Sequence, residues 1–270
     1  MKNIEKIIGI GMLLFAVGFN LWLYRLEPTS LIDPNDNAFQ FALVDRTNQI
    51  WDFAGGKCSI NILCFTSYLV DHWVPNWAQG YNLPFYYSHV PQILIVASWR
   101  LLPSLSLFTY YHWVIYFLMS LFPLSVFLAL RVIKLPWLAA GIGALLASQI
   151  STDGLYGLDP PSFLFRGWGL SSQLFAMIWL PLAIAYSWRY FTEHETRDMR
   201  HATFFLVATT MGHLGIGFIA MLSLIPLALA HPLKRFKENF LRLTVLSLTS
   251  LFFLSYWIIP IFLTNDYHNV

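Results

Sequence analysis

The stretch HATFFLVATTMGHLGIGFIAMLSLIPLALA, residues 201–230, decides how this chain is organised. It is strongly apolar but too long for a single membrane helix, which needs about 20 residues. Basic residues flank it at both ends: Arg197 and Arg200 precede it, and Lys234, Arg235 and Lys237 follow it. Because short basic segments stay on the cytoplasmic side of a membrane, we expect a hairpin of two short helices. The turn is expected near His213, where Gly212, Gly215 and Gly217 favour a break.

The composition of the whole chain also indicates a membrane protein. Hydrophobic residues make up 57% of the 270 residues and charged residues only 11%, and the mean hydropathy is +0.58. A soluble domain carries about a quarter charged residues, so lipid is the expected main solvent. The net charge of +2 is too small to indicate a nucleic-acid partner, and the sequence has no basic run with interleaved aromatic residues.

Further apolar stretches bring the expected number of membrane helices to about seven. They are Ile7–Tyr24, Tyr110–Leu130, Trp137–Ile150, Gly169–Tyr190 and Arg242–Phe262. The first is expected to be a retained signal anchor, because its apolar run is long and ends without a small-residue cleavage motif. The sequence therefore predicts an all-α integral membrane protein with a single polytopic domain over residues 1–270.

The distribution of basic residues predicts the orientation in the cell membrane. With a cytoplasmic N-terminus, Arg131 and Lys134 also lie inside, and the large loop 25–109 lies outside. We expect Val90–Leu102 to be an amphipathic helix at the outer surface, because a spanning helix there would invert every later loop. The outer loop also holds Cys58 and Cys64, which either pair in an oxidising compartment or remain unpaired small apolar residues.

A second juxtamembrane helix is expected in the sequence IDPNDNAFQFALVDRTNQIWDF, residues 32–53. Its apolar residues recur at helical spacing: Phe39, Leu43, Val44, Ile50 and Trp51. Asp33 and Asp36 lie at or near its N-terminus, where the helix dipole stabilises a carboxylate. These carboxylates either cap the helix or serve as a catalytic base, and Asp36 could also bind a divalent metal such as Mg²⁺ or Mn²⁺.

Three other groups of residues are candidates for substrate binding. Trp77, Tyr81 and Tyr86 belong to an aromatic, proline-containing segment that forms either a sugar-stacking surface or an interfacial belt. Arg166 is the only basic residue in a short outer connection, where it grips a phosphate or anchors a helix end. His213 is either a polar ligand at the tip of the hairpin or a buried histidine with internal partners.

Five motifs in order along the chain resemble a family of prokaryotic membrane proteins labelled 6-pyruvoyl-tetrahydropterin synthase-related. They are NDNAFQF (35–41), WVPNWAQGYNLPFYYSHVPQ (73–92), FRGWGLSSQLFAMIWLP (165–181), MGHLGIG (211–217) and SYWIIPIFLTNDYHN (255–269). The family is similar to the superfamily C (GT-C-like) membrane glycosyltransferases. Asn35 and Gln40 stand where histidines are common in the family, which argues against histidine-assisted metal binding.

The resemblance implies transfer of a sugar from a polyprenyl-phosphate carrier to an acceptor, a glycan or a protein, at the outer membrane face. It assigns Asp36 the role of base or metal ligand, and it makes Arg166 and His213 candidates for phosphate or acceptor binding. Family members are usually longer, so we expect this chain to be an N-terminal part of a larger cell-envelope protein.

Two competing functions follow from the same sequence. A non-catalytic membrane scaffold or assembly protein could have the same fold without the activity. A transporter is disfavoured, because the sequence shows almost no charged residues at mid-membrane depth and no related halves.

Overall fold

The computed structural model describes residues 2–29, 36–58, 61–69, 73–74, 81–82, 88–102, 104–149, 171–230 and 236–263. Within these ranges the chain is helical, apart from two paired strands of two residues each. The elements in chain order are α1 (Lys2–Leu23), η1 (Glu27–Thr29), α2 (Asp36–Cys58), α3 (Ile62–Ser67), β1 (Trp73–Val74), β2 (Tyr81–Asn82), α4 (Val90–Leu101), α5 (Leu107–Val132), α6 (Trp137–Gln149), α8 (Ser171–Glu193), α9 (Thr196–Gly212), α10 (Leu214–Leu229) and α11 (Phe236–Leu263). The all-α expectation is confirmed for this part of the chain.

Four helices of the described ranges, α1, α5, α8 and α11, are long and apolar enough to cross a membrane. The helices α4, α6 and α10 are apolar but shorter. Large apolar side chains are exposed along the bundle, among them Phe252 at 72% and Phe218 at 63%. Exposed apolar surface on this scale is expected where lipid covers the protein, so this surface and the four apolar helices indicate a membrane protein.

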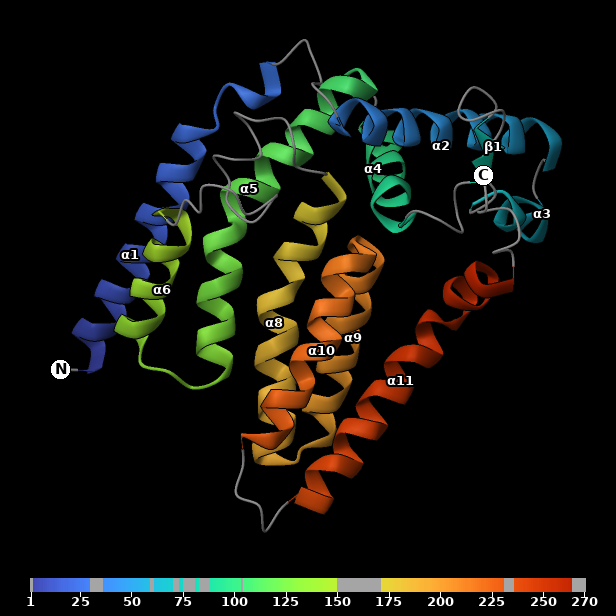
Figure 1. Cartoon of the computed structure of the whole chain (residues 1–270). Helices are drawn as coiled ribbons and strands as arrows, with labels where there is room; N and C mark the ends of the chain where they lie inside the picture. The colour runs from blue at the N-terminus through green and yellow to red at the C-terminus, as the bar shows by residue number, and fades with distance from the viewer. Residues whose placement is uncertain are drawn as a thin grey trace.

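The helices form two groups that meet at α5 and α8. Helix α1 packs against α5 and α6, while α8 packs against α9 and α10, and α11 packs against α9 and α10. Figure 1 shows the start of α1, the turns between α5 and α6 and between α8 and α9, and the start of α11 at one end of the bundle. We call this the basic end. Helices α2 and α4 and the junction of α9 with α10 lie at the opposite end, which we call the loop end (Figure 1).

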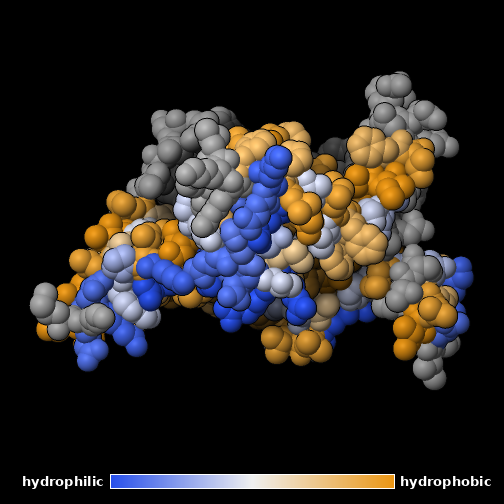
Figure 2. Space-filling model, turned by 90° about the horizontal axis from the view of Figure 1, so that it is seen from below, coloured by the Kyte–Doolittle hydropathy of each residue, from blue (hydrophilic) through white to orange (hydrophobic). Residues whose placement is uncertain are grey.

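The basic end carries a network of ion pairs that joins the two helix groups. Lys134, after α5, lies 2.6 Å from a carboxylate oxygen of Glu193 at the end of α8. Arg189 lies 3.0 Å from the other oxygen of Glu193 and 3.1 Å from the fully buried Asp198 of α9. In Figure 2, which looks onto this end, hydrophilic residues form a band across the face and hydrophobic surface flanks it.

The α9–α10 hairpin confirms the expected break in residues 201–230. Helix α9 ends at Gly212, α10 begins at Leu214, and His213 alone separates them in an extended conformation. A Cβ atom at Gly217 would lie 2.4 Å from Cα of Thr210, and one at Gly212 would lie 2.7 Å from the backbone nitrogen of Ala176. These glycines therefore let α9, α10 and α8 approach one another at backbone distance.

The two helices expected in the outer loop are present at the loop end. Helix α2 buries Leu43, Val44, Ile50 and Trp51, in agreement with the expected periodicity. Helix α4 covers the expected segment and buries a face of Pro91, Gln92, Ile95 and Val96. These two faces join Tyr24, Tyr111 and Leu174 in one apolar core that attaches the loop end to the bundle. Whether α4 lies along the membrane surface stays a prediction.

A glycine pair sets the distance between α1 and α6. A Cβ at Gly9 would lie 2.3 Å from the carbonyl oxygen of Trp137, and one at Gly141 would lie 2.8 Å from the carbonyl oxygen of Gly9. Gly11, on the same helix, has nothing within 4 Å of its Cβ position. We expect Gly9→Ala to lower the free energy of unfolding by about 1–3 kcal/mol through overpacking.

Gly11→Ala is the matched control and should leave stability unchanged or raise it slightly, because alanine favours a helix. Thermal unfolding of the purified chain in detergent measures both. Equal unfolding temperatures for the two variants would contradict this close α1–α6 contact.

Candidate functional site

The predicted site residues divide into those that the structure places and those outside the described ranges. Asp36 is the first residue of α2, Tyr81 lies in the short strand β2, and His213 joins α9 to α10. Asp33, Trp77, Tyr86 and Arg166 lie outside the described residues, so their roles stay predictions. Asp36 and His213 belong to elements at the same end of the bundle, the loop end (Figure 1).

A buried hydrogen bond anchors the start of α2 to the bundle. The hydroxyl of Tyr111 on α5 donates to Oδ1 of Asn37 over 2.7 Å. Tyr111 is fully buried and Asn37 nearly so. Asn37 directly follows Asp36, so this bond fixes the position of the residue expected to be catalytic. The first turn of a helix also has free backbone N–H groups and a positive dipole, which favour a carboxylate or a phosphate.

His213 has a structural partner in its own hairpin. Its Nδ1 accepts a hydrogen bond from the backbone N–H of Ile216 over 3.3 Å and so caps α10. The alternative of a histidine with internal partners is therefore present in the structure. A role in ligand binding would have to use the remaining ring nitrogen, Nε2.

His89 forms a second polar junction at the loop end. Its Nε2 lies 2.7 Å from the hydroxyl of Tyr256 on α11, and its ring packs edge-on against Trp257. The neighbouring Ser88 donates a hydrogen bond to the carbonyl oxygen of Gly212 over 2.8 Å. These two residues before α4 therefore connect the loop-end parts of α9 and α11.

The imidazole of His89 is neutral at physiological pH. Burial lowers its pKa to about 4, because removal from water disfavours the charged ring. Its Nδ1 has no hydrogen-bond partner in the described part of the protein. The His89 ring is therefore a neutral, buried polar group with one ring nitrogen, Nδ1, left for a further hydrogen bond.

Other buried polar atoms at the loop end also lack hydrogen-bond partners within the described residues. They are Nε2 of Gln40 on α2, Oε1 of Gln92 on α4 and Oγ of Ser172 at the start of α8. Helix α2 packs against both α4 and α8, which brings these elements together. A buried polar atom without a partner costs about 1–3 kcal/mol, so such atoms indicate a place for water or a polar ligand.

A buried hydrogen bond between a histidine and a carboxylate also lies at the loop end. Nδ1 of His112 on α5 is 2.9 Å from Oε1 of Glu27 in η1, and both side chains are almost completely buried. His112 is adjacent to Tyr111, so consecutive residues of α5 hold η1 and the start of α2. The pair links the end of α1 to the first loop.

The described residues contain no cluster of three or more histidine, cysteine, aspartate or glutamate side chains suited to a metal. In the first turns of α2, Asp36 is followed by Asn37 and Gln40, whose side chains carry amide groups rather than carboxylate or imidazole groups. A divalent metal at Asp36 stays a prediction.

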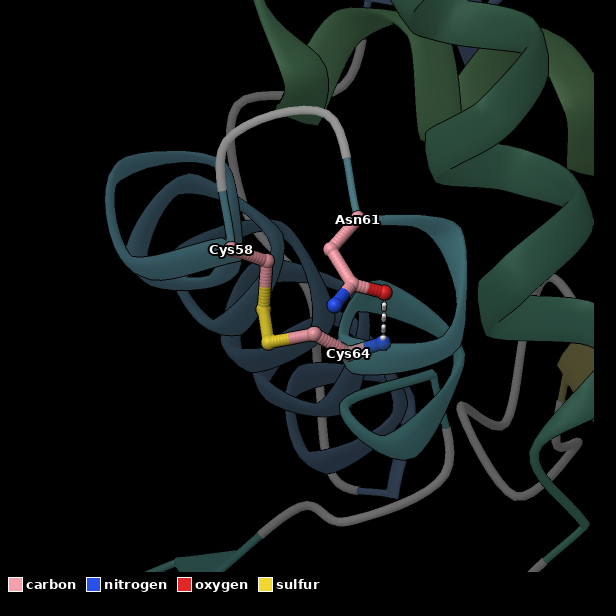
Figure 3. The surroundings of a disulfide bond; sticks show 3 residues. All are labelled: Cys58, Asn61 and Cys64. Carbon is pink, nitrogen blue, oxygen red and sulfur yellow. Dashed lines mark hydrogen bonds between the residues drawn. A yellow bond between two sulfur atoms is a disulfide. The ribbon is translucent and has the colours of Figure 1, made fainter.

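Cys58 and Cys64 form a disulfide, which decides between the two alternatives left open by the sequence. Their Cα atoms are 5.5 Å apart, and the bond ties the end of α2 to α3. Figure 3 shows the disulfide beside Asn61, whose Oδ1 accepts a hydrogen bond from the backbone N–H of Cys64 over 3.1 Å. The bridge and this bond together hold α3 close to the end of α2.

No family model, no curated protein and no solved structure matches this chain.

Sequence reasoning missed His89, Tyr256, Tyr111 and His112 as members of the site. His89 and Tyr256 lie within two of the quoted motifs, SHVPQ at residues 88–92 and SYWIIP at residues 255–260. The available signal for these two residues was a histidine and a tyrosine near the ends of apolar segments. The sequence does not indicate that they pair.

Removal of the Tyr111 hydroxyl should loosen the start of α2. We expect Tyr111→Phe to lower the free energy of unfolding by about 1–3 kcal/mol, since Oδ1 of Asn37 loses a buried donor. Tyr110→Phe on the same helix is the control, because Tyr110 is only partly buried. Chemical denaturation with limited proteolysis measures both. If both variants unfold like the unmodified chain, Tyr111 does not anchor α2.

Proposed function

We propose that this protein is a membrane glycosyltransferase that takes its sugar from a polyprenyl-phosphate carrier at the outer face of the cell membrane. In this proposal the bundle has seven spans: α1, α5, α6, α8, α9, α10 and α11. The observation that carries the proposal is the loop end, where α2 starts at Asp36 and where Gln40 and Gln92 have buried polar atoms without hydrogen-bond partners among the described residues. A lipid-linked donor presents its reacting phosphate at the membrane surface, so catalytic groups are needed at that level.

The reaction has one bond-forming and one bond-breaking event. A hydroxyl oxygen of the acceptor attacks the anomeric carbon of the sugar, and the bond from that carbon to the phosphate oxygen of the carrier breaks. Asp36 takes the proton of the attacking hydroxyl, and the carrier phosphate leaves with the electron pair. A divalent metal held by Asp36 would neutralise phosphate charge. Arg166 is proposed for the phosphate, and Trp77, Tyr81 and Tyr86 for the sugar.

The proposed orientation places the basic end in the cytoplasm and the loop end outside. Charge supports it: Lys6, Arg131, Lys134 and Arg189 belong to elements at the basic end. The Cys58–Cys64 bridge, at the loop end, also supports it, because disulfides persist in oxidising compartments outside the cytoplasm.

Thiol labelling tests this orientation. In intact cells, a membrane-impermeant maleimide should modify Cys58 and Cys64 only after treatment with an impermeant reductant. A variant with Cys58→Ser, Cys64→Ser and Lys134→Cys should be labelled only after the cells are opened. Two results would contradict the proposed orientation and remove the proposed site from the outer face. One is labelling of this triple variant in intact cells. The other is labelling of Cys58 and Cys64 without reductant that occurs only in opened cells.

The role of Asp36 separates an enzyme from a scaffold. Membranes that contain the intact protein are supplied with a radiolabelled polyprenyl-phosphate sugar, and consumption of the donor is measured. We expect Asp36→Asn to reduce the rate at least about 100-fold, the lower range for loss of a general base. Asp45→Asn, farther along the same helix, should retain the rate and the same unfolding temperature. Absence of donor consumption by the unmodified protein would favour the scaffold, and consumption by the Asp36 variant at the original rate would remove Asp36 from the proposed mechanism.

A further inference from the structure

A groove lies between α9 and α11 on the flank of the bundle. It has a volume of about 280 Å³ and is lined by Met199, Arg200, Thr203, Phe204, Val207, Thr249 and Phe253. On α11 its one polar lining residue is Thr249, whose hydroxyl donates to the carbonyl oxygen of Val245. The other polar lining residues, Arg200 and Thr203, lie near the start of α9. There Arg200 is exposed, and it forms no ion pair or hydrogen bond with the described residues.

The carboxylates of the nearby ion pairs already have other basic partners. Glu193 and Asp198 pair with Arg189, and Glu238 pairs with Arg242 and His194. Arg200 therefore remains a cation at the edge of an apolar groove. A guanidinium in this position is suited to a phosphate, which it binds through two parallel N–H donors.

One turn deeper in the groove lies a buried hydroxyl group. Thr203 is only 5% exposed, and its Oγ1 has no hydrogen-bond partner in the described part of the chain. Other threonines of α9 bond to the carbonyl four residues earlier, as Thr209 does to Phe205 and Thr210 to Leu206. Thr203 lines the groove instead and has a free donor. The rise of a helix puts it about 4.5 Å beyond Arg200.

The groove thus changes from cationic to polar to apolar along its length. Beyond Thr203, the lining residues Phe204, Val207 and Phe253 offer only apolar surface. A glycerophospholipid has the same order of groups: phosphate, ester carbonyl, acyl chain. The order of the three regions distinguishes this ligand from a purely apolar chain, which would not need Arg200 or Thr203.

We propose that this groove is a binding site for one anionic phospholipid of the leaflet at the basic end. The Arg200 guanidinium binds the headgroup phosphate, the Thr203 hydroxyl donates to an ester carbonyl, and the first acyl chain lies between α9 and α11. The bound lipid fills the space between these two helices and ties α11 to the bundle.

The test uses the full chain in detergent, with phosphatidylglycerol added at increasing concentration and bound lipid counted by native mass spectrometry. Arg200→Gln should weaken binding of one phosphatidylglycerol about fivefold, the effect of one basic side chain at an anionic bilayer surface. Thr203→Val keeps the shape and removes the hydroxyl, so it should weaken binding about threefold. Val207→Trp fills the groove and should abolish the bound lipid.

Arg197→Gln is the matched control, because Arg197 is an exposed arginine of the same helix that does not line the groove. It should change binding by less than about twofold, a smaller effect than removal of a headgroup contact. Circular dichroism and size-exclusion chromatography verify that each variant is folded. Three results would overturn the proposal. They are an equal loss of lipid binding in the Arg197 and Arg200 variants, unchanged lipid binding in a folded Val207→Trp variant, and binding of zwitterionic phosphatidylcholine equal to that of phosphatidylglycerol.

Discussion

The tight turn at His213 is the constraint on which the rest of this structure depends. One extended residue reverses the chain between α9 and α10, and glycines on either side let both helices pack at backbone distance. Because the chain reverses there, the basic start of α9 lies at the same end of the bundle as the start of α11 (Figure 1). The turn itself lies at the opposite end, beside Ser88 and α4.

The two ends of the bundle are held together by different chemistry. At the basic end, ion pairs such as Lys134–Glu193, in which both side chains are partly exposed, connect the helix groups. At the loop end, the partly exposed Arg100–Asp52 ion pair is accompanied by buried hydrogen bonds between polar side chains, such as Tyr111 with Asn37 and His89 with Tyr256. Neutral groups are less costly to bury than charges, so polar side chains persist in the interior of the loop end. A site for sugars would use such groups.

The proposed catalytic site lies at the loop end and the proposed phospholipid groove lies on the flank between α9 and α11, so these two helices contribute to both regions. His89 meets Tyr256 in the loop-end part of α11, and the lipid groove includes Phe253 and Thr249, which lie about one and two turns earlier on the same helix. A lipid that holds α11 against α9 would therefore also support the position of Tyr256. Burial of Trp257 and Leu254 shows that the inner face of α11 packs against protein along this region.

The sequence by itself determined the helical class, the break near His213, a helix with Asp36 at or near its N-terminus, and the concentration of basic residues near one set of turns. Each depends on local pattern: apolar length, glycine positions and charge beside apolar segments. Only the tertiary structure decided the pairing of Tyr111 with Asn37, which are 74 residues apart, and of His89 with Tyr256, which are 167 apart. It also joined Cys58 to Cys64 and left Thr203 without a partner among the described residues. Such contacts depend on how helices approach one another, and no local pattern in the chain encodes that geometry.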